Sequence, residues 1–370
     1  MDKAADSIFM ARALQLAERG LFTTSPNPRV GCVIVKDGVV IGEGWHERAG
    51  EPHAEVMALR SSVGAGDTPL KTSGTTAYVT LEPCSHFGKT PPCADALIAA
   101  GVTRVVVAMQ DPNPLVAGQG MVKLRAAGIA VECGLLEHEA RELNIGFVSR
   151  MTRGRPWLRV KIAASIDGKT ALNNGVSQWI TGEVARKDAH HWRARSCAIL
   201  TGIGSVKHDN PRLTVRDVTT TRQPLRVVLD SQLEILPDAA VLRDSGALIF
   251  CAEQNLIRQQ ALENAGAEVV TMPNANGRID LAAMLQELGR RGVNEVLVEA
   301  GSVLNGALLA ENLVDELLIY QAPILLGEAA RGMFAIGEIT QLGDAKRLHI
   351  LERRTLGDDS LIRACLFTAS

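Results

Sequence analysis

The sequence predicts an α/β protein made of two domains, and three observations support this expectation. The chain has 370 residues, which is more than a single compact domain usually holds. In both halves, runs rich in β-branched residues alternate with helix-like runs, a pattern typical of layered α/β domains. The alternation stops at 149–156, a basic stretch that contains Gly and Pro and has no periodicity. We therefore expect domains at 1–148 and 157–370, joined by a linker at 149–156.

The first half should begin with a helix and continue into a hairpin. Residues 1–20 have apolar side chains spaced as in an amphipathic helix. Residues 29–45 form two β-rich runs around Asp37-Gly38, a dipeptide that favours a tight hairpin turn. The elements expected after the hairpin are a helix at 53–63, a strand at 75–84, a helix at 94–101, and strands at 102–112 and 128–134.

The second half repeats the alternation after the linker. Helices are expected at 182–196, 281–292 and 302–313, and 217–224 should be a surface loop. Strands are expected at 157–165, 197–202, 225–231, 247–252, 267–272, 293–301, 315–327 and 360–369.

The composition of the chain argues against nucleic acid and membranes as binding partners. Apolar residues make up 46% of the chain, charged residues 22%, and the net charge is −2, so no broad field attracts nucleic acid or anionic lipid. Aromatic residues, which would stack on bases, make up only 4%. No apolar run approaches membrane-spanning length, and residues 1–20 contain Asp and Glu without the continuous apolar core of a signal peptide. We expect a cytoplasmic protein without nucleic-acid or membrane partners.

The seven cysteines are an odd number in a long chain without a signal peptide. Reduced thiols, buried or bound to metal, are therefore expected rather than disulfides. The cysteines that we expect to be small buried hydrophobic residues are Cys32, Cys133, Cys197, Cys251 and Cys365.

A candidate metal site combines two separate stretches, "EPHAEV" and "EPCSHFGKTPPC". His53 and Glu55 lie two positions apart in the first stretch. In the second, Cys84 follows a strand and Cys93 begins a helix, whose N-terminus favours a thiolate. His-x-Glu followed by Pro-Cys and a second Cys is the pattern of zinc deaminases, in which the Glu is not a ligand. Cys93 lies nine positions after Cys84 instead of three, so the general pattern is matched imperfectly.

Three ligands, His53, Cys84 and Cys93, would leave one position of a zinc ion open, as a catalytic site requires. A water there becomes a nucleophile near neutral pH, and Glu55 could take its proton and pass it to leaving ammonia. This chemistry is the hydrolytic deamination of an amidine-like ring carbon. In an alternative, His86 is the fourth ligand of a structural zinc site, which would leave Glu55 without a role.

Longer stretches make the match more specific. The segments "TSPNPRVGCVIV", "GWHERAGEPHAEV", "YVTLEPCSHFGKTPPC" and "DPNPLVAGQG" resemble the deaminase domain of the bifunctional deaminase–reductases of riboflavin biosynthesis, which tolerate the long insert between the cysteines. "KIAASIDGKTAL", "SQWIT", "RARSCAILTGIGSVKHDNPRLTVR" and "VEAGSVLNGALL" are similar to the reductase domain of the same family. The resemblance covers nearly the whole chain. It implies a cytidine-deaminase-like three-layer domain followed by a dihydrofolate-reductase-like domain.

The resemblance also implies two consecutive reactions. A diamino-ribosylamino-pyrimidinone 5′-phosphate is deaminated to the aminouracil, and NADPH then reduces its ribosyl side chain to a ribityl one. One zinc ion per chain is expected on His53, Cys84 and Cys93, with Glu55 as the proton-transfer residue. The deaminase pocket residues expected to contact the substrate are Asn27, His46, His86 and Lys89. We expect a homo-oligomer, either a dimer or a tetramer.

In the reductase domain, the resemblance implies separate sets of substrate and cofactor contacts. The expected substrate contacts are Ser177, Arg193, Leu213 and Arg216. The expected NADPH contacts are Ala163, Trp179, Ser205, Asp209, Gly301, Ser302, Val303, Leu304, Asn305, Gly306 and Ala307. Gly301 follows a strand and precedes a helix, where backbone amides can hold a pyrophosphate. The stretch is neither a phosphate-binding loop with Lys-Ser/Thr nor a Gly-x-Gly-x-x-Gly fingerprint.

Lys161 and Glu299 lie on strands that enter the expected reductase site, and we expect both to contact the substrate. An ammonium only donates hydrogen bonds, so Lys161 would suit the carbonyl that deamination creates and disfavour the earlier amino group. A strand-end lysine that reaches solvent is the alternative. Two rival functions stay open for the whole chain: a deaminase of tRNA or a nucleobase with an appended domain, and a zinc-stabilised module without activity.

Overall fold

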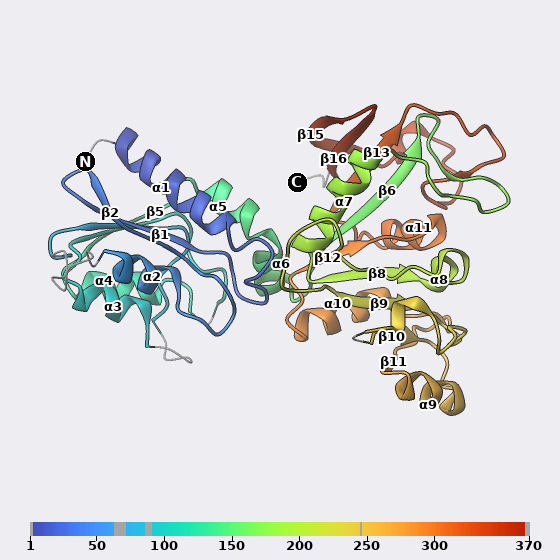
Figure 1. Ribbon diagram of the computed structural model, residues 1–370, viewed down its shortest axis with the longest axis horizontal. Coiled ribbons are helices and arrows are strands. Elements are labelled where there is room, and N and C mark those ends of the chain that lie inside the picture. The colour runs from blue at the N-terminus through green and yellow to red at the C-terminus, as the bar shows by residue number, and fades with distance from the viewer. Residues whose placement is uncertain (1–2, 63–71, 86–90, 115, 245, 367–370) are drawn as a thin grey trace. The chain divides into compact units, whose positions relative to one another are not determined.

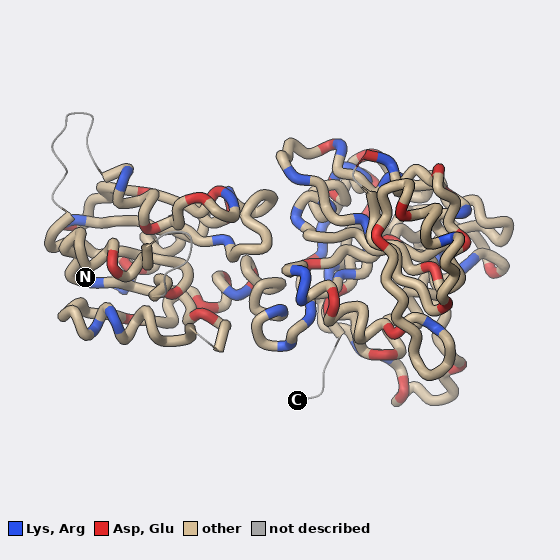
Figure 2. The backbone as a smooth tube through the Cα atoms, turned by 90° about the horizontal axis from the view of Figure 1, so that it is seen from below, with Lys and Arg blue, Asp and Glu red and all other residues tan. Residues whose placement is uncertain are grey.

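The computed structural model describes residues 3–62, 72–85, 91–114, 116–244 and 246–366 (Figure 1). The chain divides into two compact units, Met1–Gly154 and Arg155–Ser370. Each unit contains a large sheet with helices on both faces (Figure 1). Acidic and basic residues are interspersed along both units (Figure 2), in keeping with the net charge of −2.

The sheet of the first unit has the strand order β2-β1-β3-β4-β5. Its strands are β1 (Gly31–Lys36), β2 (Val39–Trp45), β3 (Thr76–Val79), β4 (Arg104–Val107) and β5 (Ala130–Cys133). β1 pairs antiparallel with β2 and β3, whereas β3, β4 and β5 are parallel. Asp37 and Gly38 both have positive φ, 50° and 79°, as the tight turn of the predicted hairpin requires.

Helices cover both faces of this sheet and make a three-layer unit. On one face lie α1 (Lys3–Glu18), α5 (Glu137–Leu143) and α6 (Ile145–Arg153). On the other lie α2 (Ala54–Ser61), α3 (Cys93–Ala99) and α4 (Gln119–Ala126). Strand alternation explains the two cores: in β1, Val33 packs toward α1 while Cys32 and Ile34 pack toward α2.

The sheet of the second unit has nine strands in the order β11-β10-β9-β8-β12-β6-β13-β16-β15. They are β6 (Trp157–Ser165), β8 (Ala198–Gly202), β9 (Leu225–Leu229), β10 (Leu248–Cys251), β11 (Glu268–Thr271), β12 (Glu295–Val298), β13 (Glu316–Ala322), β15 (Leu348–Leu356) and β16 (Asp359–Leu366). The strands from β11 to β13 are parallel, and the hairpin β15–β16 is antiparallel. A separate small sheet joins β7 (Lys169–Ala171) and β14 (Arg331–Gly332).

Helices again lie on both faces. The core that includes alternate residues of β6, β8 and β12 is covered by α10 (Leu281–Arg290) and α11 (Ser302–Ala310). On the opposite face lie α7 (Glu183–Arg195), α8 (Ile203–Asp209) and α9 (Leu256–Asn264). The short 3-10 helices are η1 (Ala240–Leu242) and η2 (Leu342–Asp344). Because parallel strands end at one edge, the segments that follow β6, β8 and β12 meet there.

The predicted α/β class and the alternation in both halves are confirmed, but the linker differs from the expectation. Residues 149–153 continue α6, since Phe147, Val148 and Met151 pack in the core and hold the helix through the basic stretch. The helix ends at Gly154, with φ 69°, where the two units divide.

Some elements and one burial prediction were missed. The helices α4, α5, α6, α8 and α9 and the strands β7, β14 and β15 lie in stretches to which no element was assigned. Among the residues of α9, only Leu262 is fully buried, so its sequence carries a weak apolar pattern. Cys133 was expected to be buried but is exposed, because it ends the edge strand β5; Cys365 is partly exposed. Among the described residues, no helix is both long and apolar enough to cross a bilayer.

Candidate active sites

In the first unit, His53, Cys84 and Cys93 come together as predicted. The His53 Nδ1 atom lies 3.2 Å from Cys93 Sγ and 3.6 Å from Cys84 Sγ. One donor atom from each of the three residues lies within 4.8 Å of the others. An imidazole nitrogen with two thiols is a donor set that zinc prefers, so the residues present fit the expected ion.

Local structure explains why residues so far apart in sequence meet. His53 has an extended backbone at the N-cap of α2, and Cys93 is the first residue of α3. The Cys93 backbone N–H donates to Cys84 Sγ at 3.3 Å, and the Ala94 N–H donates to the Cys84 carbonyl at 3.1 Å. The start of α3 therefore holds Cys84 in place across the nine-residue separation.

The thiols do not share their proton equally. A hydrogen bond from Cys93 lowers the pKa of Cys84 to about 4, against the opposing effect of burial, and His53 adds to the lowering. The same bond and burial raise the pKa of Cys93. Cys84 is thus the readier thiolate of the pair, and a cation would favour ionisation of both.

Glu55 lies in the first turn of α2 and is buried. Burial raises its pKa to about 7, and the negative charge of Cys84 adds to this rise. A carboxyl group that titrates near neutral pH can both accept and return a proton, which is the behaviour expected of a general acid–base residue.

Asn27 and His46 also lie beside this cluster. The His46 Nε2 atom is 3.0 Å from Asn27 Nδ2, and its Nδ1 atom is 3.1 Å from the Pro52 carbonyl oxygen. The rings of His46 and His53 meet edge to face with centroids 5.3 Å apart. Burial lowers the pKa of His46, although its bond to Pro52 opposes the change. The other two predicted contacts of this pocket, His86 and Lys89, lie outside the described residues.

Glu82, which precedes the Pro83-Cys84 pair, has a role that the sequence did not reveal. Its buried carboxylate accepts backbone N–H groups from Asp111, Gly118, Gly120 and Met121 at 2.8 to 3.2 Å. Gly120 lies so close that a Cβ atom there would be 1.9 Å from the Pro83 carbonyl oxygen. The loop before α4 is therefore fastened to the residues that carry Cys84. Only the motif "DPNPLVAGQG" pointed to this loop.

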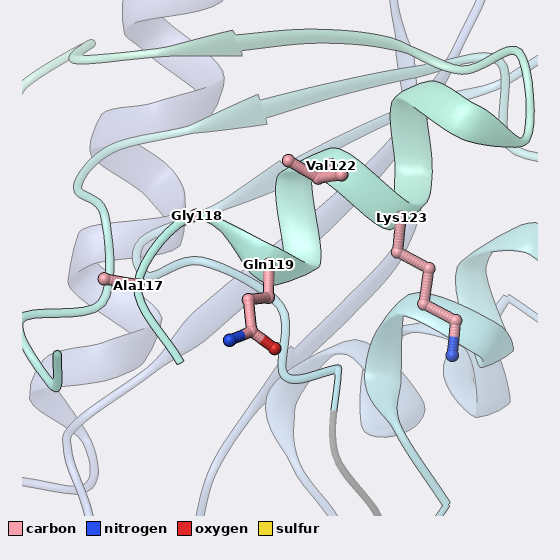
Figure 3. Close-up of a pocket in the computed structure, with 5 residues that line it drawn as sticks. All are labelled: Ala117, Gly118, Gln119, Val122 and Lys123. Atoms are coloured by element: carbon pink, nitrogen blue, oxygen red, sulfur yellow. The ribbon is translucent and has the colours of Figure 1, made fainter. Parts of the chain in front are cut away.

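A cavity of about 410 Å³ lies at the start of α4 (Figure 3). Its lining residues are Ala117, Gly118, Gln119, Val122 and Lys123. Gln119 and Lys123 extend to the same side of α4 (Figure 3), and Lys123 forms an ion pair of 2.6 Å with Asp95. None of the residues that line this cavity is a candidate metal ligand.

In the second unit, Arg193, Glu299 and Lys161 come together at the carboxyl edge of the sheet. Arg193 Nε and Nη2 donate to the two Glu299 oxygens at 2.6 and 2.8 Å, and Nη1 donates to the Thr214 carbonyl at 3.0 Å. Of the five N–H donors of arginine, two bind Glu299 and a third binds the Thr214 carbonyl. The guanidinium is thus committed largely to Glu299, and less of it is free for the expected sugar phosphate.

The charges of this cluster compensate one another. Burial alone would raise the pKa of Glu299, but Arg193 and Lys161 outweigh it and lower that pKa to about 2. Burial lowers the pKa of Lys161, while the Glu299 charge opposes this change. The Lys161 ammonium also lies 5.8 Å from the centre of the Tyr320 ring, within range of a cation–π contact.

Tyr320 and Asp188 extend this cluster and were not predicted. The buried Tyr320 hydroxyl donates to Asp188 Oδ2 at 2.6 Å, from β13 to α7. Arg354 on β15 forms an ion pair of 3.1 Å with the same carboxylate. No local motif marks either residue, because they are 132 positions apart and meet only when the sheet and α7 pack.

The other three predicted substrate contacts differ from one another in how exposed they are. Ser177 is partly exposed, Arg216 is exposed and Leu213 is buried with φ 52°. The Arg216 backbone N–H donates to His190 Nδ1 at 3.3 Å, and His190 Nε2 lies 3.3 Å from Asp217. Burial lowers the pKa of His190 to about 4.

Among the predicted NADPH contacts, Gly301 is the N-cap of α11, residues 302–307 lie in α11, and Ser205 lies in the first turn of α8. Both helices start at N-cap glycines without a side-chain cap, Gly202 and Gly301, so their first N–H groups have no such partner. A Cβ at Gly202 would lie 3.5 Å from Leu304, which places the two starts next to each other. A Cβ added at Gly301 would have no neighbouring atom within 4 Å, and Val303 is 76% exposed. An uncapped, open start of α11 fits the pyrophosphate of a dinucleotide.

Two residues of the 301–307 segment serve packing. The buried Asn305 side chain donates to the Ala300 and Met333 carbonyls, both at 3.3 Å. A Cβ at Gly306 would lie 2.2 Å from the Ala335 carbonyl oxygen, so only glycine fits. The other predicted contacts range from partly exposed (Ala163, Ser205) to exposed (Asp209, and Trp179 at 69%).

Comparison with known protein families gives a match for each half of the chain. The family model described as the RibD C-terminal domain matches residues 156–362. The model of the cytidine and deoxycytidylate deaminase zinc-binding region matches residues 3–109. The chain is 50% identical over 366 residues to the riboflavin biosynthesis protein RibD of Escherichia coli, covering 96% of this chain and 97% of that protein. The chain belongs to the RibD family.

Solved structures of RibD proteins agree over the full length. Acinetobacter baumannii RibD has a TM-score of 0.91 at 42% identity, covering 99% of this chain and 100% of its own. A Thermotoga maritima protein described as a diaminohydroxyphosphoribosylaminopyrimidine deaminase/5-amino-6-(5-phosphoribosylamino)uracil reductase has a TM-score of 0.86 at 32% identity, covering 99% of both chains.

RibD membership confirms the predicted class of enzyme. The chain is a bifunctional deaminase and reductase of riboflavin biosynthesis, with a zinc-dependent deaminase and an NADPH-dependent reductase. The cytidine-deaminase-like and dihydrofolate-reductase-like folds are confirmed as well. The second half is a RibD reductase domain, which excludes the rival in which an unrelated domain is appended to a tRNA or nucleobase deaminase.

Proposed function

We propose that His53, Cys84 and Cys93 hold one zinc ion per chain and that Glu55 transfers protons in the deamination. The observation that supports this most strongly is the approach of the His53 Nδ1 atom to both Sγ atoms, with buried Glu55 on the first turn of the same helix. The substrate is 2,5-diamino-6-(5-phosphoribosylamino)pyrimidin-4(3H)-one, as the name of the Thermotoga maritima relative suggests.

Bound zinc would supply a water that is activated for nucleophilic attack near neutral pH. Glu55 accepts a proton from this water as its oxygen bonds to the ring carbon that carries the amino group. The same carboxyl then donates the proton to the amino nitrogen as the carbon–nitrogen bond breaks and ammonia leaves. Its pKa of about 7 suits both steps.

The test is Glu55→Gln, assayed with the pyrimidinone phosphate and NADPH while ammonia release and NADPH oxidation are followed separately. We expect zinc content to stay at one per chain and ammonia release to fall by at least ~100-fold, the usual contribution of general acid–base catalysis. With the deaminated aminouracil supplied directly, NADPH oxidation should be unchanged. Exposed Glu139 on α5 provides the control Glu139→Gln. Normal ammonia release in Glu55→Gln would contradict the assignment.

For the reduction, we assign substrate contacts to Lys161, Arg193 and Glu299 together with Ser177, Leu213 and Arg216. Bound NADPH would supply a hydride to the first ribose carbon. The bond between that carbon and the ring oxygen would break, and the ring oxygen would take up a proton to give the ribityl chain. The uncapped start of α11 supports placing the cofactor along 301–307, with Ala163, Trp179, Ser205 and Asp209 as its further contacts.

Lys161 would set the order of the two reactions. Its ammonium can donate to the carbonyl that deamination creates, whereas the earlier amino group offers it no comparable acceptor. Lys161→Ala should therefore reduce the undeaminated substrate measurably faster than the wild type does. The control is Lys207→Ala, which removes an exposed lysine paired with Glu234. Unchanged rejection of the undeaminated substrate in Lys161→Ala would contradict this role.

The finer assignments of region, assembly and location are also proposals. Residues 1–148 would perform the deamination and 157–370 the reduction, which agrees with the spans of the two family models. A homo-oligomer, dimer or tetramer, is testable by light scattering. The seven cysteines, all free in the structure, are consistent with a reducing cytoplasm, testable by cell fractionation. Incubation with an RNA hairpin should release no ammonia.

A further inference from the structure

His46 lies beside the metal-ligand cluster but has no free polar atom to offer a substrate. It is 2% exposed, and both ring nitrogens have partners within the protein. Nδ1 lies 3.1 Å from the Pro52 carbonyl oxygen, and Nε2 lies 3.0 Å from the Asn27 amide nitrogen. The sequence suggested that His46 itself contacts the substrate, but this geometry favours a role that acts through Asn27.

The two partners determine where the ring carries its proton. A carbonyl oxygen only accepts hydrogen bonds, so Nδ1 must be the protonated nitrogen. An amide nitrogen only donates, so Nε2 must be the acceptor. His46 is thus held as the Nδ1–H tautomer, and its lone pair binds the Asn27 amide N–H.

The same bond orients the Asn27 side chain. With Nδ2 turned to His46, the carbonyl oxygen Oδ1 faces the other way, and it has no hydrogen-bond partner among the described residues. Asn27 is partly exposed. The His46 ring also lies edge to face with the His53 ring, with centroids 5.3 Å apart, so a single ring links the Asn27 amide to the metal-ligand cluster.

The backbone around Asn27 is fastened independently of His46. The Asn27 N–H donates to Thr24 at 3.0 Å, and Arg150 donates to the Pro26 carbonyl at 3.2 Å. Two residues further on, the Arg29 backbone exchanges bonds of 2.8 and 2.9 Å with the buried Asn144 side chain. Side-chain rotation is therefore the main freedom left to Asn27, and His46 removes it.

We propose that His46 is a positioning residue that holds Asn27 with its carbonyl oxygen toward the substrate, so that the deaminase site selects a ring that presents an N–H donor there. A pyrimidinone with an amino-substituted ring carbon carries such donors, both on the ring nitrogen and on the amino group. Without His46, the amide could turn its nitrogen to the substrate, and two donors would then face each other. The inference rests on the proposed function of the neighbouring site and deepens it.

A double-mutant cycle on the full-length zinc enzyme tests this role. The variants are His46→Leu, Asn27→Ala and the combination, each assayed for ammonia release from the pyrimidinone phosphate. We expect His46→Leu to lower kcat/KM by ~10- to 100-fold, mainly through a higher KM, as the loss of one orienting hydrogen bond in a buried site would do. Because His46 acts through Asn27, adding His46→Leu to Asn27→Ala should cause no further loss.

Two more variants distinguish positioning from a structural role. In His46→Gln the side-chain oxygen can still accept the Asn27 N–H, so KM should recover to within a few-fold of the wild type. His138→Leu changes an exposed histidine of the same unit and should leave both kinetic constants unchanged. Zinc content and NADPH oxidation with the aminouracil report on folding of each variant in the same sample.

Three results would contradict the positioning role of His46. A full additional loss from His46→Leu in the Asn27→Ala background would overturn the proposal, as would a His46→Gln enzyme no better than His46→Leu. Loss that falls mainly on kcat with unchanged KM would also overturn it. Glu55→Gln, run in parallel, reports on the catalytic site itself, so failure of the His46 role can be told apart from failure of that assignment.

Discussion

The two active-site clusters differ in how their charges are balanced. In the first unit, the imidazole of His53 lies against the thiols of Cys84 and Cys93. The lowered pKa of Cys84 favours its thiolate, and this negative charge favours binding of a cation. In the second unit, the Glu299 carboxylate already has cationic partners within the chain, Arg193 and Lys161. The first cluster is built to receive an ion, whereas the second is complete within the chain. Removal of a metal ion should therefore affect the first site, whereas removal of one side-chain charge should affect the second.

Removal of zinc should give the largest difference between them. Chelation takes away the group that activates water, so deamination should fall by more than ~100-fold. Reduction of the aminouracil should remain within about two-fold of the untreated enzyme, because the one group of three potential metal ligands among the described residues is His53, Cys84 and Cys93. Ammonia release and NADPH oxidation, measured before and after zinc is restored, check this. Parallel loss of both activities would contradict the contrast.

Breaking the Arg193–Glu299 pair should be the next largest effect. Arg193→Met leaves the Glu299 carboxylate, which is 15% exposed, beside Lys161 alone, and we expect the free energy of unfolding of the reductase unit to fall by about 2–4 kcal/mol, somewhat less than for a fully buried pair. The double variant with Glu299→Met removes both charges and should regain much of this stability. Urea unfolding monitors both. For comparison, Arg290→Ala breaks a pair whose arginine is 64% exposed and should cost about 1 kcal/mol or less.

Glu82→Ala should have a moderate effect confined to the deaminase unit. Four backbone N–H groups lose their acceptor, and leaving some of them without a partner should cost about 1–3 kcal/mol in the free energy of unfolding. Zinc affinity should weaken as well, because the loop fastened to Pro83-Cys84 is released. Thermal unfolding and zinc titration measure the two effects. An equal loss in Glu139→Ala, at an exposed site, would show that Glu82 has no special role.

The last contrast is the response of the reductase unit to acid. The pKa of Glu299 is lowered from its ordinary value of 4.5 to about 2 in the folded protein. A carboxyl with a lowered folded pKa stabilises the fold above its unfolded pKa, and this stabilisation is lost as the pH falls through the folded pKa. Stability should therefore decline between pH 4.5 and about 2, and this component should be missing in Glu299→Gln. An identical acid profile for both proteins would argue against the compensated cluster.

Much of the fold and of the zinc site could be predicted because the signals are local. The hairpin depends on Asp37-Gly38, whose positive φ values need only the two residues themselves. His53 and Glu55 lie at one helix start, and Cys84 and Cys93 lie only nine positions apart in the sequence. The helix α9 and the strand β15 were missed because their residues are largely exposed and carry little periodicity.

The sequence by itself determined the α/β class, the division into two halves and the residue types of the metal site, since each follows from short-range pattern and ligand chemistry. Only the tertiary structure decided that Arg193 binds Glu299, 106 positions away, and that Tyr320 meets Asp188 across the sheet. It also decided that Glu82 fastens the loop before α4 and that His46 faces Asn27. The physical reason is shared: a buried donor or charge must find a partner, and the partner is whichever group the packing of distant strands and helices brings within reach.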